Sequence, residues 1–523
     1  MTIVAGIDFG TQSVRVTVME TDGTPLGSAS AGYPLKRLPD APRAATQSHA
    51  DHMAALVEAM RGAIASARID GRAIAALACD TTGSSVVFVD ERMRPVSDYY
   101  LWCDHRPVRE AEAITAAFRA SGHEALDWSG GVYSLEWGYA KLLHFLRHDP
   151  AARDMASAVE HCDMVTATLT GVTRPADLKR SACAMGHKWM WNRRWGGLPP
   201  DEILARIDPL FDGINRRLES EVLTSDHIAG TLCPEWADRL GLAPGIPIPV
   251  GGVDAHWDSM GAGCRMGDMV NVIGTSTCVV AIAPAGIGTI AGVSGMVPGS
   301  VHPAHIGIEA GQSATGDLFE AIARRAKRDV ASLAAEIAHH RAGQTGLLRL
   351  PWDKGDRTVL ARPDLSGVTL GTSLDTTAAD ELFAAIEGMA MHVRIIVERM
   401  AGGGVPTERM INAGGIPQRN DILNTVYANV LGRDILVPER SPVGVGACLF
   451  AAVAAGAFQA VDAAQDALCP PMRLFRADPA AVAVYDALFA HFSALYFGFG
   501  EGRPVDLSRI LPALSDLRGA IAS

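Results

Sequence analysis

The stretch GIDFGTQSVRVTV at Gly6–Val18 has the pattern of a β-hairpin. An apolar strand ends near Asp8, a tight turn of Gly, Thr, Gln and Ser follows, and valines then alternate with polar residues. The second half of the chain repeats this pattern in NVIGTSTCVVAIA at Asn271–Ala283. The sequence therefore predicts two hairpins with small polar turns, far apart along the chain.

The residues after the first hairpin predict an α/β domain. His52–Ala67 has apolar residues at helical spacing, and Ile74–Asp80 is a short apolar run typical of a buried parallel strand. Helical segments separated by polar loops occupy about 104–240 and indicate an insertion on this core. We therefore predict an N-terminal domain at 1–258 with a helical insertion.

A second α/β domain is predicted at 259–523. After its hairpin come a long helical segment at Asp380–Met400, a strand-turn-helix at Arg409–Val430 and a helix of small residues at Val443–Gly456. Short-period repeats are not visible, which excludes solenoids and propellers. The repeat in this sequence is one of whole domains.

The composition is that of a folded protein that binds small molecules. Of 523 residues 48% are hydrophobic, and 46 basic against 58 acidic residues give a net charge of −12. This balance provides no general attraction to nucleic acid or to an anionic membrane. The most apolar run, Val443–Phe458, is shorter than the roughly 20 residues of a membrane span. We expect neither nucleic acid nor a membrane as a partner.

The cysteines and the N-terminus indicate the cytoplasm. The nine cysteines are scattered, without a C-x-x-C pair or a zinc-like cluster with histidine, which favours a reducing compartment. The first residues lack the basic region of a signal peptide and enter a strand pattern at once.

The two turns have the chemistry of a phosphate site. Their backbone N–H groups can wrap a phosphate, and their hydroxyls add donors without bulk. Asp8 precedes the first turn, where a carboxylate can hold Mg²⁺ through water. An ordinary hairpin is the alternative for either turn alone. Together the turns predict a metal-bound polyphosphate between them.

A third glycine turn, Gly414-Gly415, joins a short strand to a helix. It would let a nucleoside lie against the backbone, and a tight strand-helix connection is the alternative. Walker A and Rossmann fingerprints are not found in the right setting, so a nucleotide would be held in another way.

Several motifs resemble those of the FGGY carbohydrate kinases, a family with the actin, hexokinase and Hsp70 ATPase fold. The two hairpins and MINAGGIPQRN at 410–420 are similar to the family's two phosphate motifs and its adenosine motif. Further segments follow in the family's order and are most similar to the L-ribulokinases. They are LWCDH (101–105), GGVYSLEW (130–137), SACAMGHKWMWNRRWGGLPP (181–200), GTLCPEWADRLGL (230–242), GGVDAHWDSMGAG (251–263) and IGIEAGQSATGD (306–317).

The resemblance implies two duplicated RNase H-like domains with ATP and Mg²⁺ in the cleft between them. It assigns Asp8 to the metal, and it implies that PQRN, which departs from the family's usual run, lies in the adenosine pocket with its register open to a shift of one residue. The implied nucleotide site comprises Asp8, Thr11, Gln12, Ser13, Arg15, Gly274, Thr275, Ser276, Gly311, Gly414, Gly415 and Asn420.

The resemblance also implies transfer of phosphate to a sugar. Asp254 in GGVDAH falls on the family's catalytic base, and an aspartate that caps the next helix is the alternative. The implied sugar site comprises Gly83, Trp102, Lys188, Asp254 and Glu309. A flat apolar face with fixed donors and acceptors suits a polyol, whereas a core Trp, a surface Lys and an ion-paired Glu are the alternatives.

The acceptor that this resemblance predicts is a ketopentose hydroxyl, that of ribulose. Cys103 stands where a ribulokinase would have lysine, so D-ribulose, xylulose and erythritol are kept as alternatives. An actin- or Hsp70-like ATPase without sugar transfer and a non-catalytic sugar-binding regulator are the rival classes. A homodimer is the habit of the family.

Overall fold

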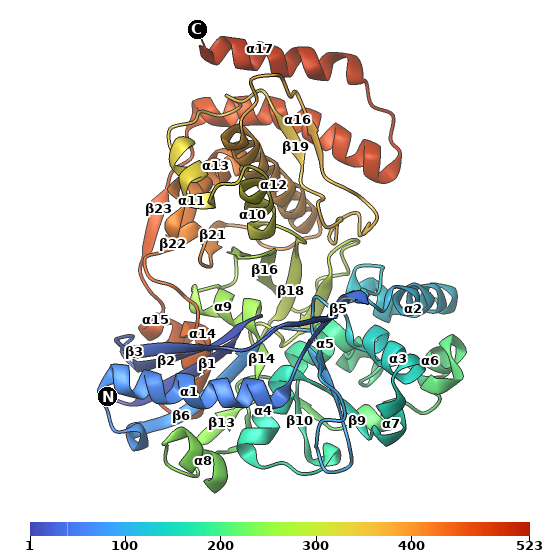
Figure 1. Ribbon diagram of the computed structural model, residues 1–523, viewed down its shortest axis with the longest axis vertical. Coiled ribbons are helices and arrows are strands. Elements are labelled where there is room, and N and C mark those ends of the chain that lie inside the picture. Colours follow the sequence, from blue (N-terminus) through green and yellow to red (C-terminus); the bar gives the residue numbers. More distant parts are fainter. Residues whose placement is uncertain (39, 523) are drawn as a thin grey trace.

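Two sheets with the same inner strand order form the centres of the two halves of the protein (Figure 1). The computed structural model describes residues 1–38 and 40–522. The first sheet has the order β14-β6-β1-β2-β3, in which β1 is antiparallel to β2 and parallel to β6. Its strands are β1 (Ile3–Phe9), β2 (Ser13–Glu20), β3 (Pro25–Gly32), β6 (Ile74–Thr81) and β14 (Gly252–Val253).

The second sheet repeats this arrangement with one extra strand at each edge. Its order is β17-β18-β16-β15-β21-β22-β23, in which β15 is antiparallel to β16 and parallel to β21. The strands are β15 (Asp268–Ile273), β16 (Thr277–Ala283), β17 (Gly295–Pro298), β18 (Ile306–Gln312), β21 (Arg409–Ala413), β22 (Ile435–Pro438) and β23 (Met472–Phe475). Both predicted hairpins are confirmed, and the duplicated order is that of the actin-like ATPase fold.

The first hairpin forms because its alternating valines are buried and its turn is closed from two sides. Val14, Val16 and Val18 are fully buried against the first core. Gly10 N–H donates to Ser13 O at 3.0 Å, and Tyr33 Oη lies within hydrogen-bond distance of the carbonyl oxygens of both Gly10 and Ser13. The small polar turn is therefore held in one conformation.

Helices cover both sheets. In the first half they are α1 (His49–Ala67), α2 (Val108–Ser121), α3 (Gly138–His148), α4 (His161–Thr170), α5 (Ala182–Trp189), α6 (Asp201–Ile207), α7 (Asn215–Leu218), α8 (Pro234–Leu240) and α9 (Asp254–Gly261). In the second half they are α10 (Gly316–Arg325), α11 (Val330–Glu336), α12 (Ala378–Gly402), α13 (Asp421–Leu431), α14 (Val445–Ala454), α15 (Val461–Leu468), α16 (Pro479–Glu501) and α17 (Ile510–Ala522).

The region 104–240 differs from the predicted helical insertion. Its strand β9 (Ser157–Glu160) joins a third sheet with β4 (Lys36–Leu38), β5 (Ala41–Gln47), β7 (Val86–Val89) and β8 (Tyr99–Tyr100). Leu169 of α4 and Trp236 of α8 belong to the first core. Parts of the expected insertion are thus integral to the first domain, because their apolar faces complete its core.

Three small two-stranded sheets complete the strands of the protein. They are formed by the short strands β10 (Lys179–Ser181), β11 (Glu221–Leu223), β12 (Ile228–Thr231), β13 (Pro247–Pro249), β19 (Leu348–Leu350) and β20 (Val368–Leu370).

Helix α14 connects the two halves. It comes from the second half but packs beside β1 and β6, and one apolar cluster contains Val4, Ala76, Val270 and Phe450 (Figure 1). A Cβ atom at Gly6 would lie 2.6 Å from Gly444 O, so only glycine allows this approach of helix and strand. The small residues of this helix, visible in the sequence, serve close packing between the halves.

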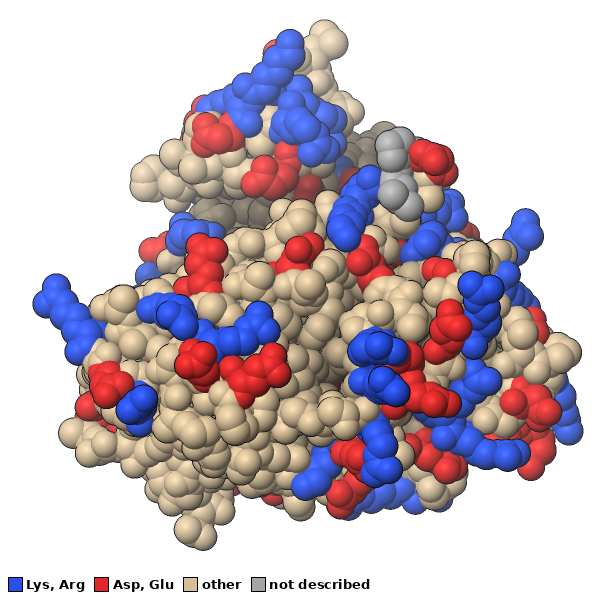
Figure 2. Space-filling model, turned by 60° about the horizontal axis from the view of Figure 1, so that its bottom comes forward, with Lys and Arg blue, Asp and Glu red and all other residues tan. Residues whose placement is uncertain are grey.

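Among the residues that the structure describes, helix α16 is the one helix that is long and apolar enough to cross a membrane, and a third of its most apolar window is buried inside the protein. Tyr485 Oη donates to Glu387 at 2.9 Å and Tyr496 Oη donates to Asp356 at 2.5 Å, and both tyrosines lie in the second core. These contacts identify α16 as a core helix. On the face shown in Figure 2, acidic and basic side chains are interspersed.

Candidate active site

A cavity of about 460 Å³ lies between the two hairpins and is lined from both halves of the chain. It combines the turns that were predicted to bind phosphate with the side chains that were predicted to bind sugar. The predicted residues that line it are Thr11, Gly83, Trp102, Lys188, Asp254, Gly274, Thr275, Ser276, Glu309, Gly414 and Gly415. Residues far apart in the sequence therefore meet at one place.

Other predicted residues lie behind or beside this cavity. Gln12 and Ser13 are exposed at the first turn, and Arg15 donates to Ser30 Oγ at 3.4 Å. Gly311 pairs with a residue of β16 inside the second sheet, and Asn420 accepts from Leu423 N at 3.1 Å as the cap of α13. The side chain of Asn420 thus has a structural role, which the sequence pattern did not separate from nucleotide binding.

The first turn is linked to the sugar side of the cavity. Trp102 Nε1 donates to Thr11 Oγ1 at 3.1 Å, and Gln47 Nε2 donates to Thr11 O at 2.8 Å. The indole that was predicted as a sugar wall therefore also fixes a residue of the phosphate loop.

The second turn is fixed by the start of α10. Thr315 N donates to Thr275 O at 2.9 Å, and Gly316 N donates to Gly274 O at 3.0 Å. A Cβ atom at Gly316 would lie 2.9 Å from that same carbonyl oxygen of Gly274. Both turns are held from behind, which leaves their outer faces toward the cavity.

Four carboxyl groups gather below the first turn. Asp8 and Asp80 are neighbours across β1 and β6, and Asp254 begins α9 with Asp258 one turn later. Burial and repulsion from the neighbouring acids raise the pKa of Asp254 to about 7, and the same causes raise the pKa of Asp80 and of Asp258 well above the usual range. Burial also raises the pKa of Asp8.

This cluster lacks an equal number of cations. Arg15 is the basic residue that lowers the pKa of Asp8 and Asp258, and Asp80 Oδ1 is buried without a hydrogen-bond partner among the described residues. Clustered carboxylates with a free buried oxygen are the chemistry that a hard divalent cation prefers. The donor set therefore fits Mg²⁺.

Asp80 and Asp258 were missing from the predicted site, although a signal for each exists in the sequence. Asp80 ends a strand that runs parallel to β1, and carboxyl ends of parallel strands meet at one edge of a sheet. Asp258 follows Asp254 by four residues on a helix, which places both carboxyls on one face.

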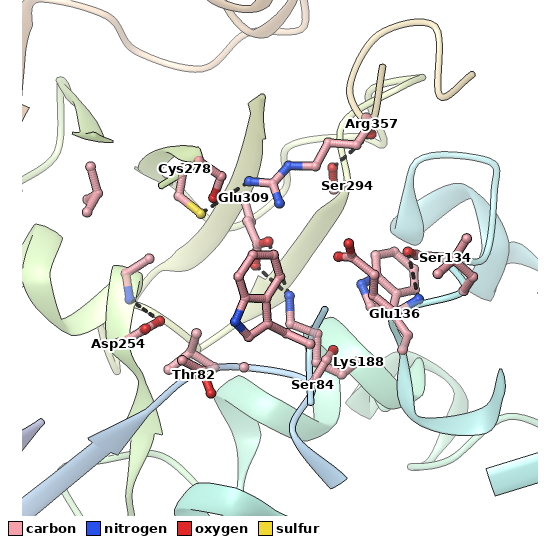
Figure 3. A pocket seen from close by; sticks show the side chains of 18 of the residues that line it. Thr82, Ser84, Ser134, Glu136, Lys188, Asp254, Cys278, Ser294, Glu309 and Arg357 are labelled. Carbon is pink, nitrogen blue, oxygen red and sulfur yellow. Dashed lines mark hydrogen bonds and ion pairs between the residues drawn. The ribbon is translucent and has the colours of Figure 1, made fainter. Parts of the chain in front are cut away.

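A buried ion pair forms the centre of the cavity (Figure 3). Lys188 Nζ lies 3.1 and 2.9 Å from the two oxygens of Glu309, and His256 Nε2 lies 3.1 Å from Glu309 Oε2. Burial of Glu309 disfavours its charged form. The charge of Lys188 and the contact with His256 nevertheless hold the pKa of Glu309 well below its usual range. Because the ammonium group already contacts both oxygens, these residues form a hydrogen-bonded pair rather than a metal centre.

The lack of a side chain at Gly83 leaves room for the Lys188–Glu309 pair. A Cβ atom at Gly83 would lie 2.9 Å from Val253 and 3.3 Å from Cε of Lys188. A side chain here would displace the lysine stem or fill the cavity beside it.

Comparison with known proteins agrees with this geometry. Models of the FGGY family of carbohydrate kinases match the chain, the N-terminal domain at 3–261 and the C-terminal domain at 269–455. A ribulokinase of Vibrio parahaemolyticus is 34% identical over 516 residues, which cover 90% of this chain and 91% of the relative. A ribulokinase of Shouchella clausii is 31% identical over 98% of this chain and 97% of the relative.

The fold is also found in a solved structure. The crystal structure of xylulose kinase from Rhodospirillum rubrum has a TM-score of 0.80 to this chain at 23% identity and covers 95% of this chain and 100% of its own. The two family models together span most of the sequence, in the same order as the two sheets. The chain therefore belongs to the FGGY family of carbohydrate kinases.

Proposed function

We propose that this sugar kinase transfers the γ-phosphate of ATP to a hydroxyl of ribulose, with Asp254 as the general base. The observation that carries the proposal is the place of Asp254 on the wall of the cavity, within the carboxyl cluster and near enough to Glu309 for that charge to raise its pKa. A carboxylate with a pKa of about 7 is a stronger base than an ordinary aspartate and is largely ionised at slightly alkaline pH.

The chain's residues divide the work of phosphoryl transfer. Thr11 and the turn 274–276 offer N–H and hydroxyl donors to the phosphates, and Gly414-Gly415 provides a flat backbone for the nucleoside. Asp8, Asp80 and Asp258 would hold Mg²⁺, which shares the negative charge of the phosphates when bound. Asp254 accepts the proton of the attacking hydroxyl, and Lys188 with Glu309 orients the rest of the sugar.

Ribulose is proposed because both curated relatives described above are named ribulokinases. Xylulose, D-ribulose and erythritol remain alternative acceptors, because each presents hydroxyl groups that the same donors and acceptors of the cavity can bind. We also infer a cytoplasmic location and a domain boundary near residue 258, which lies within α9, whereas the homodimer stays a prediction.

The test is ADP release over a panel of ketopentoses and polyols at fixed Mg²⁺-ATP. We expect little ADP without sugar and the highest kcat/KM with one of the ribulose enantiomers. Equal ADP release with and without every acceptor would contradict a sugar kinase and would favour an actin-like ATPase. A preference for xylulose or erythritol would retain the reaction and change the acceptor.

A further inference from the structure

The cavity extends beyond the predicted sugar residues. Figure 3 shows Asp254 at one side and Glu136 at the other, with Lys188 and Glu309 between them. Glu136 and Arg357 also line the cavity, and neither was among the residues predicted from the sequence. An acceptor whose reacting hydroxyl lies at Asp254 and whose middle contacts the ion pair would reach these two residues with its other end.

Glu136 is held as a carboxylate with its head group toward the cavity (Figure 3). His105 Nε2 lies 3.1 Å from Glu136 Oε1, and Glu136 N donates to Ser134 Oγ at 3.2 Å. Burial opposes ionisation, but the hydrogen bond from His105 lowers the pKa of Glu136 below its usual value. Among the residues that the structure describes, Oε1 has this partner and Oε2 has none, so one acceptor oxygen is available to a ligand.

Arg357 lines the same cavity from the second half of the chain, and its positive charge is among the causes that lower the pKa of Glu136. Its neighbour Asp356 is buried and accepts from Trp352 Nε1 at 3.1 Å, which fixes the loop. Arg357 Nη2 donates to Thr277 O at 3.0 Å and lies 3.4 Å from Cys278 Sγ. A guanidinium group has five N–H donors, so most of them stay free for a ligand.

We propose that Glu136 and Arg357 form a chain-end subsite, which binds the hydroxyls at the end of an open-chain sugar remote from the phosphorylated one. A carboxylate that accepts and a guanidinium that donates together satisfy the hydroxyl groups of a diol end. The subsite rests on the proposed function, because it deepens the same acceptor site. It would select acceptors by length, since a three-carbon acceptor held at Asp254 does not extend past the ion pair.

The test compares long and short acceptors in Glu136→Gln. The long acceptor is ribulose, and the short one is dihydroxyacetone; if the wild type prefers other acceptors, the longest and the shortest that it phosphorylates are used. We expect KM for the long acceptor to rise about tenfold or more, which is typical for loss of a charged hydrogen bond. KM for ATP and kcat/KM for the short acceptor should stay within about twofold.

Glu112→Gln is the matched control. Glu112 also lines the cavity but is exposed to solvent. The same chemical change there should leave the ratio of kcat/KM for the long acceptor to kcat/KM for the short acceptor unchanged. Thermal unfolding of both variants, with and without ATP, checks that they fold and bind nucleotide. His105→Ala is a second variant. Like Glu136→Gln, it should lower kcat/KM for the long acceptor relative to that for the short acceptor, because the Glu136 carboxylate loses the partner that holds it in place.

Two results would overturn the subsite. One is an unchanged long-to-short ratio in a folded Glu136→Gln protein. The other is an equal loss for both acceptors, which would show that Glu136 only supports the structure. Failure of the proposed function is a separate result, because it would appear in the wild type as ADP release that no acceptor increases.

Discussion

The two hairpins have the same backbone design but different charge. When the turn glycines Gly10 and Gly274 are aligned, Asp8 of the first strand corresponds to Val272 of the second. The first sheet pairs Asp8 with Asp80 across β1 and β6, whereas the second pairs Val272 with Ala413 at the corresponding positions of β15 and β21. The two halves thus share the turn that is proposed to bind phosphate, whereas the acids proposed for the metal and for the base are concentrated in the first half.

An amide network lies one residue earlier in the strands of the second half than the positions that correspond to Asp8 and Asp80. Asn271 Nδ2 donates to Asn412 Oδ1 at 2.8 Å, and Asn412 Nδ2 donates to Asn424 Oδ1 at 3.1 Å. Asn271 lies one residue earlier in its strand than Val272, so its side chain points to the opposite face of the sheet. These amides join the sheet to α13 instead of facing the ligand. In the proposed function, the second half therefore contributes most of the phosphate and nucleoside contacts, and the first half contributes the base and the metal carboxylates.

Replacing Asp254, the proposed base in the first half, should have the largest effect on the reaction. We expect Asp254→Asn to lower kcat for ADP release by about 10²–10⁴-fold, the range for loss of a general base. ATP binding, measured by thermal shift, should change little, and the metal-free protein should unfold at an equal or higher temperature because one repelling carboxylate is gone. A variant that retains wild-type turnover would remove Asp254 from the base role.

The sugar side should show the next largest effect. Lys188→Met keeps the apolar stem but removes the charge that holds Glu309, so we expect KM for the sugar to rise about 10–100-fold, as for a buried charged hydrogen bond. KM for ATP should rise much less. Initial rates with each substrate varied in turn give both constants, and an unchanged sugar KM would contradict the assignment.

The carboxyl cluster should make stability depend on pH and on metal. Its pKa values in the folded protein are raised, to about 7 for Asp254, whereas in the unfolded chain they are near 3.8. Between these values the cluster binds more protons in the folded state, so its contribution to metal-free stability should fall as pH rises from about 4 to about 7. Mg²⁺ should offset this loss, with a larger increase in Tm at pH 8 than at pH 5.

Asp80→Asn sharpens that experiment. Asp80 does not line the cavity, but its free Oδ1 belongs to the cluster. The variant should reduce the pH dependence of the metal-free Tm and the gain from Mg²⁺ together. Asp238→Asn, on an exposed residue of helix α8 in the first half, is the control and should leave both unchanged. Equal Mg²⁺ effects in all three proteins would place the metal elsewhere.

The local sequence pattern was sufficient to predict the hairpins. It was not sufficient to predict which side chains come together only when the chain has folded. The alternating valines and the small turn predicted β1 and β2 because both signals lie within a few residues. The helix after Asp254 was considered only as one that this residue would cap, so the common face of Asp254 and Asp258 was missed. Glu136 and Arg357 lie in connecting segments whose approach depends on packing of the two halves, which no spacing in the sequence records.

The smallest predicted effects are those of removing one hydroxyl from each turn, and they should differ between the turns because only Thr11 contacts Trp102. Thr11→Val and Thr275→Val each remove one hydroxyl of a phosphate turn, so each should raise KM for ATP by roughly two- to tenfold, as for one neutral hydrogen bond. Thr11 Oγ1 also accepts the indole N–H of Trp102, whereas the backbone of Thr275 is bonded to the start of α10. Only Thr11→Val should therefore raise KM for the sugar, by a similar factor. Trp102→Phe, which keeps an aromatic face but loses the N–H, should reproduce that increase. If the two threonine variants changed the sugar KM equally, the link between indole and turn would have no functional weight, and the halves would differ in charge alone.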